Sequence, residues 1–299
     1  MPSETLSRST IWLLAIRPKT LPAAVGPVAV GSAMALRDDG FAALPALACL
    51  LGSLLLQIAV NLANDYFDGK NQIDTAERLG PVRVTQSGLL TPGEVKRAMV
   101  FTFLLAGPVF LYLAMIGGPP IVIIAIASVL AALAYSGGPY PLASNGLGEV
   151  FVFIFFGLVA VGGSYFVQTG GLTWEVLLAA LPPGLLITAI MVVNNLRDIA
   201  GDARAGKRTL AVILGPRKTI VEYRLLLLTA YLVPLAMAVF GGGWAVLLPL
   251  LTLPVAWSQA KQVGGEQGRA LNRLLAATAV LSLGFSLLFA LGLVWGRLE

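Results

Sequence analysis

The chain has 299 residues, of which 57% are hydrophobic and only 12% are charged, and its mean hydropathy is +0.85. Soluble domains carry about a quarter charged residues, so this composition excludes a water-soluble globular protein and predicts an integral membrane protein. The sequence has no histidine and one cysteine. These counts exclude histidine-based acid–base catalysis, metal centres built from histidine or from cysteine clusters, and an intrachain disulfide.

Long apolar stretches alternate with short turns rich in glycine and proline, such as 117–120, 137–139 and 241–243. A stretch of about 20 apolar residues is long enough to cross about 30 Å of hydrocarbon as a helix. The sequence predicts nine membrane helices, at 11–36, 42–67, 96–116, 119–136, 148–168, 175–197, 221–240, 243–260 and 271–295. We therefore expect an all-α membrane protein in which residues 1–299 form a single integral-membrane domain.

Lysine and arginine are distributed unevenly among the predicted connections. If the N-terminus is cytoplasmic, 18 of the 20 basic residues fall in cytoplasmic segments, and only Arg37 and Arg297 fall outside. This asymmetry predicts a cytoplasmic N-terminus and an external C-terminus. The net charge of +5 then reflects topology, and it gives no support for nucleic-acid binding. The first apolar segment is too long for a signal peptide, and a bacterial inner (plasma) membrane is the simplest location.

Two short stretches, 64–68 (Asn-Asp-Tyr-Phe-Asp) and 194–198 (Asn-Asn-Leu-Arg-Asp), share the pattern Asn-x-x-x-Asp at the ends of apolar segments. Together with Asp74 and Asp202 just beyond them, they contain five of the seven aspartates. Basic residues follow both stretches on the predicted cytoplasmic side, namely Arg78 and Arg83 after the first and Arg204, Lys207 and Arg208 after the second. Carboxylates and cations together at a membrane surface predict a site for Mg²⁺ and a diphosphate.

The spacing of these residues places their side chains on shared helix faces. Residues four apart point the same way on a helix, as do Asn64 and Asp68, and Asn194 and Asp198. Clustered carboxylates repel one another unless a cation joins them, and Mg²⁺ binds carboxylate and amide oxygens while bridging phosphate. If the two helix ends face each other, their oxygens can hold metal ions around one diphosphate. The predicted metal ligands are Asn64, Asp68, Asp74, Asn194, Asp198 and Asp202.

Three further features lie on the predicted cytoplasmic side. The segment 78–88 is too polar for a membrane span, and we expect it to cover the site when substrate binds and to exclude water. Tyr135 and Tyr140 are suited to stabilise a cation or to orient an aromatic acceptor, although interfacial tyrosines also serve as anchors. Lys19 is suited either to bind a carboxylate or phosphate or to act as a positive anchor.

These residues give the chain a resemblance to a known family. It resembles the UbiA-type intramembrane prenyltransferases and, within them, is most similar to the 1,4-dihydroxy-2-naphthoate prenyltransferases of menaquinone and phylloquinone biosynthesis. The matching stretches are 17–21, 61–68, 78–88, 135–141, 194–202 and 206–210. The superfamily often has a third aspartate where this chain has Gln72, whereas Asp74 fits the naphthoate branch.

The resemblance implies nine helices, a Mg²⁺-dependent site in a lipid bilayer, and transfer of a prenyl chain from a prenyl diphosphate to 1,4-dihydroxy-2-naphthoate with loss of CO₂. The product would be demethylmenaquinol or its phytyl equivalent. The resemblance also implies catalytic roles for Asp65, Asp68, Asp198, Asp202, Arg83, Tyr135 and Tyr140. The residues implied to bind the diphosphate or the acceptor carboxylate are Arg78, Lys207, Arg208, Arg197 and Lys19.

Three other functions compete with this hypothesis. A related prenyltransferase could act on another acceptor, such as 4-hydroxybenzoate, homogentisate, haem or chlorophyllide. A cation-coupled transporter would use intramembrane acids as a relay, but the acids here cluster at helix ends on one side. A phosphatidyl-alcohol transferase would carry the signature Asp-Gly-x-x-Ala-Arg, whereas Asp68-Gly69 is followed here by Lys-Asn-Gln-Ile.

Overall fold

The computed structural model describes residues 6–70, 79–80 and 82–296, and within these ranges the chain is helical and contains no strand. Seven helical segments there are long and apolar enough to cross a membrane. They are α3 (Ala43–Lys70), α4 (Pro92–Gly117), α5 (Pro119–Ser136), the segment Gly148–Thr169, α8 (Trp174–Arg204), α10 (Pro216–Val239) and the segment Gly268–Trp295, which contains α12 (Leu271–Trp295). They coincide with seven of the nine predicted helices, and the chain is a multi-pass membrane protein.

The first predicted helix, 11–36, is broken. Its parts are α1 (Arg8–Ile16), η1 (Pro18–Thr20) and α2 (Pro22–Arg37). Arg17 ends α1 in the left-handed region, with φ of 56°, and the chain bends by 44°. Because Pro18 and Pro22 have no N–H group to continue the helical hydrogen bonds, the helix cannot run through them. The prediction of one continuous helix is therefore wrong, and the bent pair forms a possible eighth span.

The predicted helix 243–260 also differs from a regular span. It consists of the 3₁₀ helix η4 (Trp244–Thr252) followed by α11 (Leu253–Gln262). Pro249 and Pro254 interrupt the regular helical hydrogen bonds of this segment. Within the described part of the chain it is not among the helices long and apolar enough to span a membrane. The total of nine spans therefore stays a prediction.

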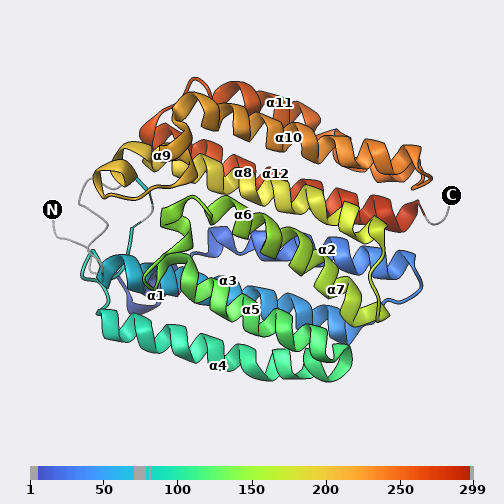
Figure 1. Ribbon diagram of the computed structural model, residues 1–299, viewed down its shortest axis with the longest axis horizontal. Coiled ribbons are helices and arrows are strands. Elements are labelled where there is room, and N and C mark those ends of the chain that lie inside the picture. The colour runs from blue at the N-terminus through green and yellow to red at the C-terminus, as the bar shows by residue number, and fades with distance from the viewer. Residues whose placement is uncertain (1–5, 71–78, 81, 297–299) are drawn as a thin grey trace.

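The helices lie side by side in layers (Figure 1). α10 and α11 lie at one edge and pack on α8 and α12, while α3, α4 and α5 pack together at the other edge. α2 and α7 lie between these two groups. The largest hydrophobic core joins α2, α7, α8, α10 and α12, and it includes the fully buried rings of Phe285 and Phe289. Cys49 is buried in a smaller cluster of side chains from α2, α3, α4, α5 and α7.

The end of α3 and the end of α8 lie at the same end of the bundle (Figure 1). The short helix α9 (Leu210–Leu214) follows α8 there and packs against α8 and α10. The two Asn-x-x-x-Asp motifs belong to these two helix ends, so the fold brings motifs about 130 residues apart to one end of the molecule.

A wide helical turn shapes the centre of the bundle. The segment Gly148–Thr169 consists of α6 (Gly148–Val152), the π-helical η3 (Phe153–Val159) and α7 (Ala160–Thr169). η3 crosses α8 where Gly157 meets Gly184, and a Cβ atom built on Gly184 would lie 2.9 Å from the Cα of Gly157. A π-helical turn rotates the residues that follow it, and π-helical turns are frequent at functional sites.

Candidate active site

A cavity of about 1430 Å³ opens between the helices. Its polar end is lined by side chains of both Asn-x-x-x-Asp motifs, and its body is lined mainly by apolar side chains such as Leu56, Phe110 and Ile187. Ile121 and Tyr135 both line it and lie 14 residues apart on α5, so it extends about 21 Å along that helix. The cavity therefore has room for a molecule with an anionic head and a long apolar tail.

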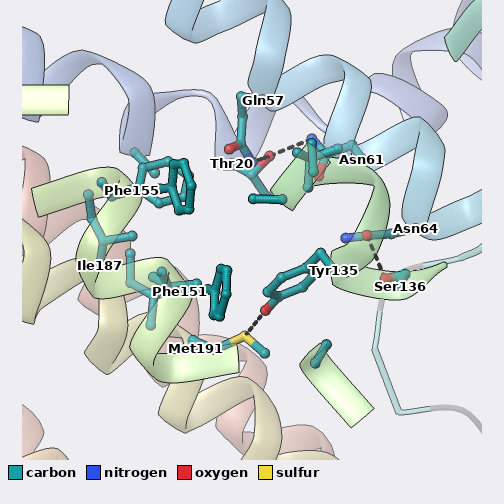
Figure 2. A pocket seen from close by; sticks show the side chains of 18 of the residues that line it. Thr20, Gln57, Asn61, Asn64, Tyr135, Ser136, Phe151, Phe155, Ile187 and Met191 are labelled. Carbon is teal, nitrogen blue, oxygen red and sulfur yellow. Dashed lines mark hydrogen bonds between the residues drawn. The ribbon is translucent and has the colours of Figure 1, made fainter. Parts of the chain in front are cut away.

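The first motif lies on the last turns of α3. The Asp68 carboxylate pairs with the guanidinium of Arg83 at 2.5 Å, and both side chains are more than nine-tenths buried and line the cavity. One turn earlier, Asn64 Oδ1 accepts a hydrogen bond of 2.7 Å from the hydroxyl of Ser136 (Figure 2). The spacing of four residues places Asn64 and Asp68 on the same cavity wall, as the sequence predicted.

Asp65 has a different environment. Its carboxylate accepts hydrogen bonds from the backbone N–H groups of Val84 and Thr85 at 3.1 and 3.0 Å, and from the Thr85 hydroxyl. Arg17 lies 3.8 Å from it, and the side chain of Asp65 is 1% exposed. Asp65 is not among the residues that line the cavity. In this structure it ties the segment after the first motif to α3, and its predicted catalytic role stays a prediction.

The second motif lies near the end of α8 and is organised by Arg197. This guanidinium pairs with Asp198 at 2.5 Å and donates hydrogen bonds of 2.8 Å to Asn194 Oδ1 and Asn272 Oδ1. Asn272, on α12, in turn donates to the backbone oxygen of Leu79 at 2.9 Å. Arg197 is buried behind the cavity wall, whereas Asn194 and Asp198 line the cavity. The structure therefore places Arg197 as the centre of a network that joins α8, α12 and the segment at 79.

Of the basic residues that follow the second motif, some line the cavity and one lies at the surface. Asp202 and Lys207 line the cavity and form an ion pair of 3.5 Å. Arg204 also lines the cavity. Arg208 is exposed and is not among the lining residues. Lys207 is therefore the better placed of the two predicted diphosphate ligands, while the role of Arg208 stays a prediction.

Of the two predicted tyrosines, one lines the cavity and the other is exposed at the surface. The Tyr135 hydroxyl donates a hydrogen bond of 3.2 Å to the sulfur of Met191, and its ring faces the cavity beside Phe151 (Figure 2). We call the space between Tyr135, Phe151 and Met191 the aromatic slot. Tyr140 is 59% exposed and is not a lining residue, so only Tyr135 of the two predicted tyrosines lies at the cavity.

Opposite the aromatic slot, the cavity has a polar wall (Figure 2). The hydroxyl of Thr20 accepts hydrogen bonds from the amide groups of Gln57 and Asn61, at 3.3 and 2.8 Å. Lys19 and Arg17 line the cavity beside them. Lys19 was predicted, whereas Gln57 was missed because a single polar residue within an apolar helix forms no motif.

The remaining predicted ligands, Asp74 and Arg78, lie outside the described residues. Among those described, no group of three or more histidine, cysteine or acidic side chains is close enough together to hold a metal ion. Each acid that lines the cavity is instead paired with a basic side chain. Their carboxylate and amide oxygens are of the type that Mg²⁺ prefers, so the donor set fits this ion chemically, and the predicted metal site stays a prediction.

The model of the UbiA prenyltransferase family matches residues 24–275. The chain belongs to this family. Its cavity and both acidic motifs lie almost entirely within the matched region.

Individual proteins of this family resemble the chain over nearly their whole lengths. The 1,4-dihydroxy-2-naphthoate octaprenyltransferase of Haemophilus influenzae is 38% identical, over 96% of both chains. The protein of the same description from Escherichia coli is 37% identical, over 98% of both chains. A UbiA homolog from Archaeoglobus fulgidus, solved bound to DMAPP and Mg²⁺, is 15% identical with a TM-score of 0.64, over 95% of this chain and 99% of that one. This last similarity shows a shared fold.

Proposed function

We propose that this UbiA-family protein transfers a prenyl group from a prenyl diphosphate to 1,4-dihydroxy-2-naphthoate, with release of diphosphate and CO₂. The observation that carries the proposal is the 37–38% identity, over nearly complete chains, to proteins described as 1,4-dihydroxy-2-naphthoate octaprenyltransferases. The cavity agrees with such a donor, because charged groups lie at one end and apolar side chains line its body.

At the polar end, the residues of both motifs bind the diphosphate. Lys207 and Arg83 line this end and contribute positive charge to phosphate oxygens. Mg²⁺, when bound, neutralises charge on the leaving diphosphate, and its ligands would be Asp68, Asp198 and Asp202 together with the amide oxygens of Asn64 and Asn194. To bind such a cation, these carboxylates would have to exchange the arginine and lysine partners that they have in this structure.

The body of the cavity protects the reacting carbon from water. The bond between the donor's first carbon and the diphosphate oxygen breaks, and the allylic carbon carries the positive charge. A ring carbon of the acceptor attacks it, and the acceptor's carboxylate leaves as CO₂, which returns its electron pair to the ring. The rings of Tyr135 and Phe151 face this region and favour a cation over water.

We also propose how the chain is oriented in the membrane. The chain is one integral-membrane domain of nine spans in a bacterial inner membrane, with its N-terminus and the polar end of the cavity in the cytoplasm. The excess of lysine and arginine in the connections on that side supports this orientation. Soluble diphosphates and Mg²⁺ would then reach the site directly.

The test uses purified protein in detergent or lipid, incubated with 1,4-dihydroxy-2-naphthoate, Mg²⁺ and prenyl diphosphates of several lengths. Mass spectrometry of the extract should show prenylated naphthoquinol, which disappears when EDTA is added. Parallel reactions use 4-hydroxybenzoate and homogentisate. A product only with one of these acceptors would contradict the proposed substrate and keep the reaction class, whereas no product with any acceptor would contradict the proposed activity.

A further inference from the structure

A buried glutamate lies directly behind the cavity wall. Glu149, in the first turn of α6, is 5% exposed and is not among the lining residues. Its Oε1 accepts a hydrogen bond of 2.6 Å from the side-chain amide of Asn195 on α8. None of the roles assigned above uses Glu149, although a buried acidic side chain costs free energy unless its contacts compensate.

Asn195 connects this glutamate to the cavity. It is 3% exposed and is one of the lining residues. A side-chain amide has a donating end and an accepting end, and the donating end of Asn195 points to Glu149. Because Glu149 Oε1 is the acceptor of this hydrogen bond, the contact holds the amide of Asn195 in one of its two orientations. In that orientation, Oδ1 of Asn195 points away from Glu149 and is left to accept a hydrogen bond from a molecule in the cavity.

The position of Asn195 along α8 indicates which part of a bound substrate its Oδ1 atom would meet. Asn195 lies one turn beyond Met191, which forms part of the aromatic slot, and about 4.5 Å deeper along α8 than Asp198 by helical rise. Gly148, next to Glu149, lies against the same slot, because a Cβ atom there would be 3.4 Å from the Tyr135 hydroxyl and 3.3 Å from the Met191 methyl group. Along α8, Asn195 therefore lies between the level of Asp198 and that of the slot.

The chemistry of the transfer also places the acceptor at this level. The reacting carbon of the donor is joined directly to the diphosphate oxygen, so the acceptor ring must lie beside the anionic end and deeper than it. The acidic side chains at the polar end are Asp68, Asp198 and Asp202. Asn194, next to Asn195 on α8, already accepts a hydrogen bond from Arg197 at its Oδ1. The neutral amide oxygen of Asn195, deeper than Asp198, suits a hydroxyl donor on an aromatic ring better than a phosphate, which offers mainly acceptors.

We propose that Asn195 Oδ1 accepts a hydrogen bond from a ring hydroxyl of the aromatic acceptor, and that Glu149 is a positioning residue that holds the Asn195 amide in the orientation this requires. The inference rests on the proposed prenyl transfer to a dihydroxylated ring. It adds two acceptor-positioning residues, only one of which touches the substrate.

The test measures, in the purified protein, the binding of the acceptor and of the donor separately. Calorimetric titration with 1,4-dihydroxy-2-naphthoate gives acceptor affinity without turnover, and initial rates give KM for acceptor and donor. Asn195→Ala and Glu149→Ala should each weaken acceptor affinity about tenfold, the usual effect of one lost hydrogen bond, with the donor KM unchanged. The double variant should match Asn195→Ala alone, since both changes remove the same interaction.

The conservative variant Glu149→Gln separates positioning from packing. Glutamine keeps the volume and can still accept from Asn195, so acceptor affinity should fall less than in Glu149→Ala, and this variant carries the test if Glu149→Ala does not fold. Unchanged acceptor affinity in a folded Asn195→Ala protein, or multiplicative effects in the double variant, would overturn the inference. Absence of product in the unaltered protein would instead count against the proposed function, so the two failures are distinguishable.

Discussion

At the scale of single residues, the cavity is organised by pairs of opposite charge. Asp68 pairs with Arg83, Asp198 with Arg197, and Asp202 with Lys207. Buried carboxylates are costly without such partners, and removal of one partner leaves an uncompensated charge. A substitution in any of these pairs is therefore expected to change both the stability of the protein and its affinity for an anion at the polar end.

Asp68→Asn is expected to lower kcat/KM for the prenyl diphosphate by at least about 100-fold, because it removes a carboxylate proposed to bind the Mg²⁺ that neutralises the leaving diphosphate. Initial rates at saturating acceptor measure this effect. The matched control is Asp39→Asn, at the end of α2 far from the cavity's polar end, where φ is 60° and asparagine is well tolerated. Equal rates for both variants would contradict the role of Asp68.

Asp65→Ala tests the other acid of the first motif. It leaves the N–H groups of Val84 and Thr85 without their acceptor, and we expect a loss of about 1–3 kcal/mol in the free energy of unfolding. Thermal unfolding in detergent should show a clearly lower Tm. An unchanged Tm together with a complete loss of activity would favour the direct catalytic role that the family resemblance implies.

The sequence predicted part of this residue-scale arrangement. Asn64, Asp68, Asn194, Asp198 and Asp202 all line one cavity, as their spacing on two helix ends indicated. The contact between Glu149 and Asn195 could not be predicted, because it joins residues 46 positions apart whose distance depends on helix packing. The same holds for the Thr20 contacts of Gln57 and Asn61.

At the scale of helices, long apolar runs predicted the positions of most helices correctly, and the predictions failed where prolines interrupt the helix. The predicted helix 271–295 agrees with α12 at both ends, and 119–136 agrees with α5. The prediction failed at 11–36, where Pro18 and Pro22 break the helix, because hydropathy does not report the missing backbone N–H groups. The π-helical turn also escaped prediction, since it depends on how this segment packs against α8.

The crossing of η3 and α8 should depend on its glycines. In Gly184→Ala, the new Cβ would lie 2.9 Å from the Cα of Gly157 and 3.1 Å from the backbone oxygen of Phe153, so the helices must move apart. We expect a loss of about 1–3 kcal/mol in stability and a lower Tm in detergent.

The matched control for this crossing is Gly284→Ala, a helical glycine of α12 with no atom within 4 Å of the position of its Cβ. Alanine favours helix there, so Tm should stay unchanged or rise. A similar fall in Tm for both variants would contradict a specific role for the close approach.

At the scale of the whole molecule, the fold joins two helix ends into one site. α3 and α8 end on the same side, and the motifs they carry line one cavity whose apolar body extends between the helices. The sequence predicted this meeting from the matched motifs and the basic loops on one side. It did not predict the number of regular spans, because segment 243–260 is divided between a 3₁₀ helix and a short α-helix.

The proposed orientation predicts which side is accessible in cells. Gly93→Cys, at the start of α4, should react with a membrane-impermeant maleimide only after permeabilisation, whereas Gly171→Cys, before α8, should react in intact spheroplasts. Both glycines are exposed. Because Cys49 lines the cavity, both variants are made in Cys49→Ala protein. The reverse labelling pattern would contradict a cytoplasmic polar end.

Titration of the purified protein with geranyl diphosphate and Mg²⁺, without acceptor, tests most directly whether both motifs bind one diphosphate. The account predicts one donor molecule bound per chain, and an affinity at least tenfold weaker in Asp68→Ala and in Asp198→Ala alike, since each removes a carboxylate proposed to bind the Mg²⁺ that holds the diphosphate. Unchanged affinity in either variant, or two donor molecules per chain, would contradict a single site shared by the two motifs.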